Sequence, residues 1–196
     1  ANDIRVDDFT VLNEDAAPGE HVIHVRRLRG GLLAEDGRLE LRAVDADTDL
    51  GHFTAEGTYA PRDDYRTDLL ATAVLPAAAG RTPARLGLVA RGDLAEMEVA
   101  VAGRAPGEVR ATLVLRGEPD GTVGDGPGMA SREAPQWQLD AFADALEPGL
   151  LTGAEGDSAT APMQLELHAT GLAGDARLRG EFRQGDFEVR LLPSRV

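Results

Sequence analysis

Apolar side chains occupy every second position in most segments of this chain that can build regular structure. The alternation recurs in successive segments between Phe53 and Leu115, and glycine residues interrupt it. A period of two places alternate side chains on one face of a sheet. The pattern therefore predicts short antiparallel strands with an apolar face that includes Phe53, Leu69, Leu88, Met97, Val99, Val101, Leu113, Leu115, Leu165 and Leu167.

Chain length and turn chemistry favour one all-β domain over residues 1–196. All-β architectures of this size commonly form a single domain. Turn-forming sequences such as Ala105-Pro106-Gly107 separate the alternating runs by only a few residues, and short connections favour a meander of hairpins. Strands are predicted near 3–12, 20–29, 38–46, 51–60, 67–75, 84–92, 95–103, 108–117, 161–171, 174–183 and 186–192.

Two segments depart from this rhythm. Residues 117–135 are rich in glycine and proline and have no apolar periodicity, so we expect a flexible excursion there. Residues 137–146 fit either a strand or one face of a short helix, and a strand followed by a helical turn is the preferred interpretation.

The charge balance excludes several classes of partner. The formal net charge is -14, with 34 acidic and 20 basic residues, and every basic residue is arginine. Nucleic acids and anionic membranes need a positive field, so neither is an expected partner. Because there is no cysteine, disulfides and thiolate metal sites are impossible. No apolar run is long enough for a membrane helix, and the N-terminus without methionine suggests a mature product or an excised segment.

The nearest match to a metal motif is a row of acidic residues. Asp45, Asp47, Asp49 and Glu56 have the spacing of ligands 1, 3, 5 and 12 of a calcium-binding EF-hand loop. Leu50 occupies the position that requires glycine, and both flanks alternate as strands instead of helices. An acidic hairpin turn is therefore the favoured interpretation.

Catalytic patterns are weak throughout the sequence. His21 and His24 are three apart on a predicted strand and point to opposite faces, and Gly156-Asp157-Ser158 lies in a polar loop without strand–turn–helix context. No phosphate-binding glycine loop occurs. A glycosidase with paired carboxylates is the enzyme alternative, but no spacing pairs two carboxylates in an apolar pocket. We expect a protein that is not an enzyme and has no cofactor or metal.

The predicted apolar face is rich in alanine and poor in aromatic residues. Small side chains leave space, which favours a sheet curled into an open trough that accommodates an acyl chain. The alternative is a second sheet that closes the core, giving a β-sandwich that binds carbohydrate or protein. Sugar stacking would then depend on Trp137, Tyr59 and Tyr65.

The order of these motifs resembles the TamB family, the translocation and assembly module proteins related to AsmA-like repeating β-groove proteins. The resemblance lies in Asp49–Tyr59, Leu69–Leu75, Leu88–Leu94, Val99–Val101 with its following Pro/Gly turn, Ala111–Leu115, Trp137–Leu139 and Leu146–Pro148. It extends over residues 3–192.

Membership of that family implies an internal segment of a longer periplasmic protein whose strands form a continuous open β-taco with a hydrophobic groove. Such proteins carry phospholipid between the inner and outer membranes, serve outer-membrane biogenesis and partner an outer-membrane barrel of the assembly-factor type. Family members have an N-terminal inner-membrane anchor and a C-terminal domain. This chain shows no anchor, so membrane attachment is expected outside the segment.

Overall fold

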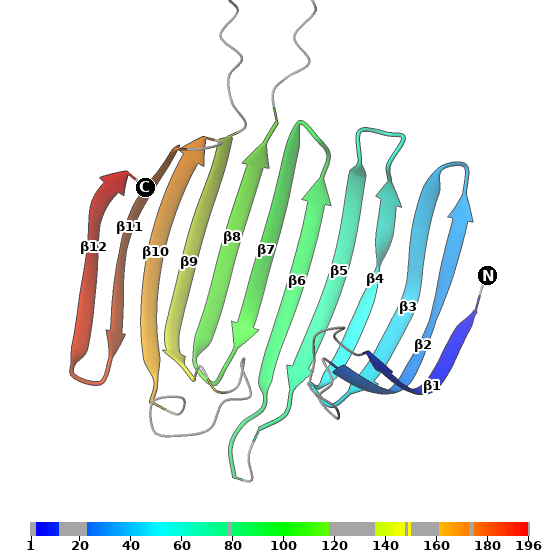
Figure 1. Ribbon diagram of the computed structural model, residues 1–196, viewed down its shortest axis with the longest axis horizontal. Helices are drawn as coiled ribbons and strands as arrows, with labels where there is room; N and C mark the ends of the chain where they lie inside the picture. Colours follow the sequence, from blue (N-terminus) through cyan, green and yellow to red (C-terminus); the bar gives the residue numbers. More distant parts are fainter. Residues whose placement is uncertain are drawn as a thin grey trace, which may run out of the picture.

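The structure is a computed structural model that describes residues 3–11, 23–77, 80–117, 136–147, 149, 161–172 and 175–195. All described strands belong to one twelve-stranded sheet, and they follow one another in chain order from β1 to β12 (Figure 1). Every neighbouring pair is antiparallel. The predicted all-β antiparallel meander is confirmed.

The sheet is open, because β1 and β12 are its two edges and do not pair with each other. This is the arrangement expected of an open curled groove. The described residues form no second sheet, so they do not build the closed β-sandwich considered as the alternative fold. Among them, no helix is long and apolar enough to cross a membrane.

The strand bounds agree closely with the alternation in the sequence. They are β1 (Ile4–Val11), β2 (Ile23–Glu35), β3 (Arg38–Thr48), β4 (His52–Ala60), β5 (Arg66–Leu75), β6 (Ala84–Gly92), β7 (Glu96–Arg104), β8 (Glu108–Arg116), β9 (Gln136–Leu146), β10 (Met163–Leu172), β11 (Asp175–Gln184) and β12 (Phe187–Arg195). The ambiguous segment before Pro148 is a strand, as preferred. The predicted excursion lies outside the described residues except for Gly117, and so do most residues of the expected helical turn.

Strand β2 is longer than predicted, and the difference has a physical reason. The pair Gly30-Gly31 is typical of a turn, yet both residues lie inside the strand. A Cβ on Gly30 would lie 2.9 Å from the Cα of Val44, so only glycine permits this close approach. The register between β2 and β3 shifts on both sides of Leu28 and Arg29, and the edge of the sheet bends strongly at β1 and β2 (Figure 1).

One end of the sheet has a small buried core, which we call the sealed end. Its residues are Ala84, Ala105, Ala143 and Leu146, with exposures of 0%, 0%, 3% and 7%. The turn after β7 lies across this end, because the Glu147 amide donates to the Ala105 carbonyl at 2.8 Å and Pro106 bridges to Leu146. Arg81 pairs with Glu147 over the same region.

Candidate functional site

The pairing register places alternate residues of β4 to β10 on one surface, which we call the apolar face. Four cross-strand rows make it up. From the sealed end they are Phe53, Ala73, Leu86, Gly103, Val109, Ala143, Leu165; then Ala55, Ala71, Leu88, Val101, Ala111, Ala141, Leu167; then Gly57, Leu69, Ala90, Val99, Leu113, Leu139, Ala169; and Tyr59, Thr67, Gly92, Met97, Leu115, Trp137, Gly171.

All ten residues predicted to line a groove lie on this face. Their order along the rows follows from direct cross-strand pairs such as Leu88 with Val101 and Val99 with Leu113. Leu165 differs from the rest, because it packs against the sealed end. Their common placement is observed, whereas their role in lining a lipid groove stays a prediction.

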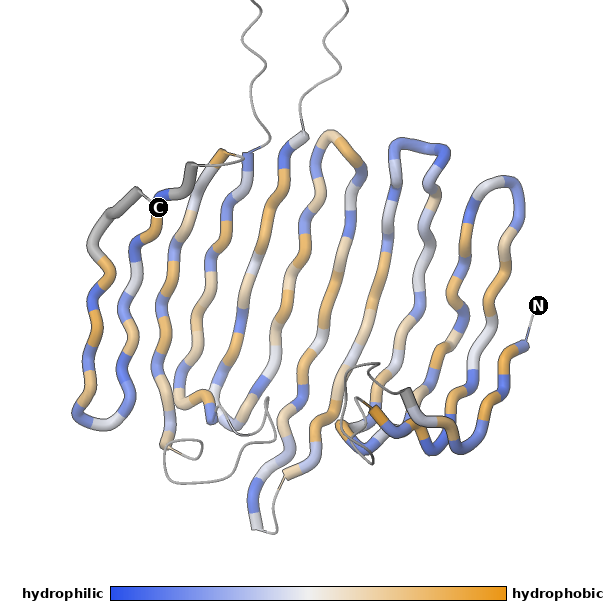
Figure 2. Tube along the Cα trace, in the orientation of Figure 1, coloured by the Kyte–Doolittle hydropathy of each residue, from blue (hydrophilic) through white to orange (hydrophobic). Residues whose placement is uncertain are grey.

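The apolar face carries no charged side chain in the strand residues described between β4 and β10. The alternation of apolar and polar residues along each strand is visible in Figure 2. Most residues of the face are half-buried, and Leu115 is 41% exposed. No large side chain in the described part of the chain is fully buried. The face is therefore an apolar surface that the described residues leave uncovered along most of its length.

The opposite face, which we call the charged face, is held by cross-strand pairs of polar groups. Arg91 pairs with Asp68 at 3.2 Å between β6 and β5, and Arg116 pairs with Glu96 at 2.9 Å between β8 and β7. The Arg110 guanidinium lies 4.3 Å from the ring centroid of Phe142. Exposed pairs of this kind contribute about 1 kcal/mol or less each, so they explain solubility and register better than stability.

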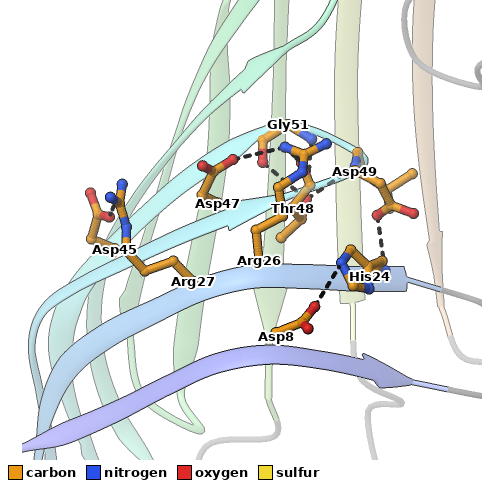
Figure 3. Close-up of polar contacts among 10 residues, drawn as sticks. Asp8, His24, Arg26, Arg27, Asp45, Asp47, Thr48, Asp49 and Gly51 are labelled. Atoms are coloured by element: carbon orange, nitrogen blue, oxygen red, sulfur yellow. Dashed lines mark hydrogen bonds and ion pairs between the residues drawn. The ribbon is translucent and has the colours of Figure 1, made fainter.

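The acidic residues with EF-hand spacing are distributed along a hairpin. Figure 3 shows Asp45 and Asp47 beside the arginines of β2, and Asp47 accepts a hydrogen bond from Arg26 at 3.1 Å. Asp49, in the turn, accepts from the His24 amide at 3.0 Å (Figure 3). Glu56 lies farther along β4, opposite Leu70.

Thr48 stabilises this hairpin turn, because its hydroxyl donates to the Gly51 carbonyl and accepts from the amides of Leu50 and Gly51. In the part of the chain that the structure describes, no three acidic, histidine or cysteine side chains converge in a way that could hold a metal ion. The acidic residues of this segment contribute to a hairpin and to ion pairs with its neighbours.

Three histidines pair with aspartates from neighbouring strands on the polar surface. His24 lies 3.3 Å from Asp8, His52 lies 3.3 Å from Asp45, and His168 lies 2.5 Å from Asp140. The hydrogen bond from His168, together with one from Gln138, holds the pKa of the Asp140 carboxyl below its usual value. The side chains of these pairs are substantially exposed to solvent.

Other sequence candidates fall into two groups. His21 and the segment 156–158 lie outside the described residues. Of the three candidate sugar-stacking aromatics, Tyr59 and Trp137 belong to the fourth row of the apolar face, and the Tyr65 ring lies 6.3 Å from that of Tyr59. Tyr59 and Trp137 are separated by β5 to β8, so the three rings do not form one stacking platform.

Two surface depressions lie toward the first edge of the sheet, and of the second and third rows, which we call the central rows, Gly57 is the residue that lines one of them. The one near the turn after β2, of about 840 Å³, is lined mainly by polar residues such as Glu40, Arg66 and Asp68. Another, of about 630 Å³, lies beside it around Glu56 and Arg91. The apolar face is an open part of the sheet, whereas sites for compact small molecules are usually enclosing pockets.

The sequence patterns underestimated how far the apolar face extends. Leu28 on β2 and Leu41 on β3 continue it toward the first edge, and Phe182 and Val189 continue it toward the last. Register shifts in β2, β3 and β12 break the period of two. Cross-strand pairing recovers these positions, but a single-strand pattern does not.

Comparison with known proteins gives no relative for this chain. No protein-family model matches the sequence, no curated protein matches it, and no solved structure matches its fold.

Proposed function

We propose that this chain is a non-enzymatic lipid-binding segment whose apolar face accepts the acyl chains of phospholipids. The observation that carries the proposal is the uncharged surface that continues through β4 to β10 and that the described residues leave largely uncovered. Monomeric soluble proteins rarely expose so large a continuous apolar surface without using it for binding.

The geometry favours an elongated ligand over a compact one. Neighbouring strands are about 4.8 Å apart, so an acyl chain of about 20 Å laid across the strands contacts four or five of them. Complete burial of an acyl chain of about sixteen carbons contributes on the order of 10 kcal/mol at about 0.8 kcal/mol per CH₂, and an open face recovers only part of this. A moderate binding free energy that is similar all along the rows suits an acyl chain that moves across the sheet.

The distribution of charge supports recognition of the tail instead of the head group. The rows of the apolar face have no cation to hold a phosphate, and the net charge of -14 disfavours concentration of anionic head groups near the protein. We expect the phospholipid head to remain in water while the tail lies on the apolar face.

The wider biological setting of the proposal rests on the TamB resemblance. We propose that the segment belongs to a periplasmic protein anchored to the inner membrane outside this region, which moves phospholipid toward the outer membrane and meets an outer-membrane assembly-factor barrel. The continuous meander is compatible with such a conduit, because it repeats one kind of apolar row without a singular site.

Native mass spectrometry tests the lipid proposal directly. The purified chain is incubated with liposomes of phosphatidylethanolamine and phosphatidylglycerol, separated from them and sprayed under native conditions. We expect phospholipid adducts on the wild type, at least a tenfold loss of adduct in Leu113→Arg, and wild-type levels in Thr112→Arg. Leu113 lies in the third row of the apolar face, whereas Thr112 pairs with Ala100 and Asp140 on the charged face.

Circular dichroism of both variants controls for folding, since both retain the sheet if the effect is local. Lipid adducts that are absent from the wild type, or equal in the two folded variants, would contradict the proposal.

A further inference from the structure

The apolar face is compatible with a second copy of itself. The described residues of the apolar face on β4 to β10 are uncharged, and the charged side chains of these strands lie on the opposite face. An isologous two-fold contact brings the same patch of each copy together, and an uncharged patch avoids repulsion between like charges in such a contact.

The size of the face matches the requirement of a stable dimer. Seven strands with a spacing of about 4.8 Å, crossed by the three rows of alternate residues beyond the sealed end, present roughly 700 Å². Specific protein interfaces bury about 800 Å² on each partner. Apart from Gly57, the central rows are formed by Leu, Val and Ala, and apolar side chains of this kind fill the space between stacked sheets in β-sandwiches.

We propose that in water without lipid two copies of the chain stack apolar face against apolar face and form a two-layer β-sandwich. The sheets pack about 10 Å apart with both charged faces outward. Ion pairs such as Arg91 with Asp68 then remain in solvent, and salt at physiological strength screens the repulsion between the two negative copies. Dimerisation uses the same apolar face as the proposed lipid binding but does not depend on it. A lipid and a second copy therefore compete for this face.

Sedimentation velocity of lipid-free protein tests the dimer. We expect the wild type and Thr112→Arg to shift from monomer to dimer between about 1 and 100 μM, the range of moderate protein affinities, while Leu113→Arg stays monomeric with unchanged circular dichroism. Addition of the same phospholipid liposomes should return the wild type to monomer. A wild type that is monomeric throughout that range, or a folded Leu113→Arg that still dimerises, would overturn the proposal.

Cross-linking identifies the face that forms the contact. Because the chain has no cysteine, Val101→Cys and Ala100→Cys each create a single reactive site, the first on the apolar face and the second on the charged face. A short bis-maleimide should link two copies of Val101→Cys and leave Ala100→Cys unlinked. An edge-to-edge dimer through β1 or β12 would hold both positions roughly 50 Å or more from their counterparts, and neither variant would cross-link.

The results separate this inference from the proposed function. Lipid adducts on a protein that never dimerises contradict the stacked dimer alone. A cross-linked dimer that acquires no lipid supports the stacked dimer and contradicts the proposed function.

Discussion

Ala111 and Ala143 lie on the same face of neighbouring strands, but their surroundings differ. Ala143 is 3% exposed, because the turn after β7 and the end of β9 cover it, whereas Ala111 is only half-buried. The residue types and the strand geometry are alike. The difference lies in whether another part of the chain crosses the face. Among the described residues of the second and third rows, Ala169 alone is as buried as Ala143, with an exposure of 2%.

This comparison separates two roles of apolar residues in the sheet. At the sealed end the apolar residues form a small core, and their nearly complete removal from water stabilises the fold. In the central rows they are held side by side by backbone pairing, and all of them except Ala169 are at least partly exposed to solvent. The sheet therefore keeps its structural core at one end and its candidate binding surface elsewhere, so substitutions should affect stability and binding separately.

The largest expected difference between the two regions comes from a buried charge. Ala143→Asp places a carboxylate among the buried apolar side chains of Ala84, Ala105 and Leu146. We expect a loss of about 3 to 5 kcal/mol in the free energy of unfolding. Ala111→Asp is the matched control, and it should lose less than about 1 kcal/mol since water reaches it. Urea denaturation measures both, and equal losses would show that the open rows are as covered as the sealed end.

A second comparison concerns two glycines within the central strands. Gly57 has φ of 153°, and a Cβ there would lie 2.2 Å from the carbonyl oxygen of Asp68. Gly57→Ala should therefore cost about 1 to 3 kcal/mol. At Gly87 the nearest atom to such a Cβ is 3.8 Å away, and Gly87→Ala should be neutral or stabilising by a few tenths of a kcal/mol. Thermal denaturation of both variants checks the pair; similar melting temperatures would mean that the β4–β5 pairing is looser than described.

The smallest expected effect is a pH dependence on the charged face. Because hydrogen bonds from His168 and Gln138 lower the pKa of Asp140, the folded state favours the ionised carboxylate. The resulting stability is present above the unfolded-state pKa, near 4, and is lost as pH falls through the lower folded-state value. Asp140→Asn should lack this contribution, so wild type and variant should differ by less than about 1 kcal/mol at pH 6 and converge at the acid end. If wild type and Asp140→Asn differ in urea-measured stability by the same amount from pH 6 down to acid pH, the lowered pKa of Asp140 does not contribute as described.

The sequence predicted the sheet well because strand formation here depends on local alternation. Leu69, Leu88 and Val99 keep a strict period of two between recognisable turns, and the register confirms that they share a face. Prediction was weaker where the geometry is irregular. Gly30 continues β2 at a point where Val44 comes too close for any other residue, and Ala145, with φ of 53°, precedes Leu146 where the chain enters the sealed end.

Whether the apolar face is covered was the question that the sequence left open. The same alternation is compatible with a closed sandwich and with an open sheet, since coverage depends on contacts between distant segments. The order β1 to β12 answers it for the described residues: every strand extends the same sheet, and none returns to cover it. Lipid binding itself needs a measurement.

Site-specific photo-crosslinking tests the central claim most directly. A photoreactive amino acid replaces Leu88 on the apolar face or its neighbour Val89 on the charged face, and each protein is irradiated with liposomes of phosphatidylethanolamine and phosphatidylglycerol. We predict phospholipid adducts at position 88 in large excess over position 89, since only the first points toward the acyl chain. Adducts that are absent at position 88, or equally abundant at both positions, would contradict the account of the apolar face as a lipid-binding surface.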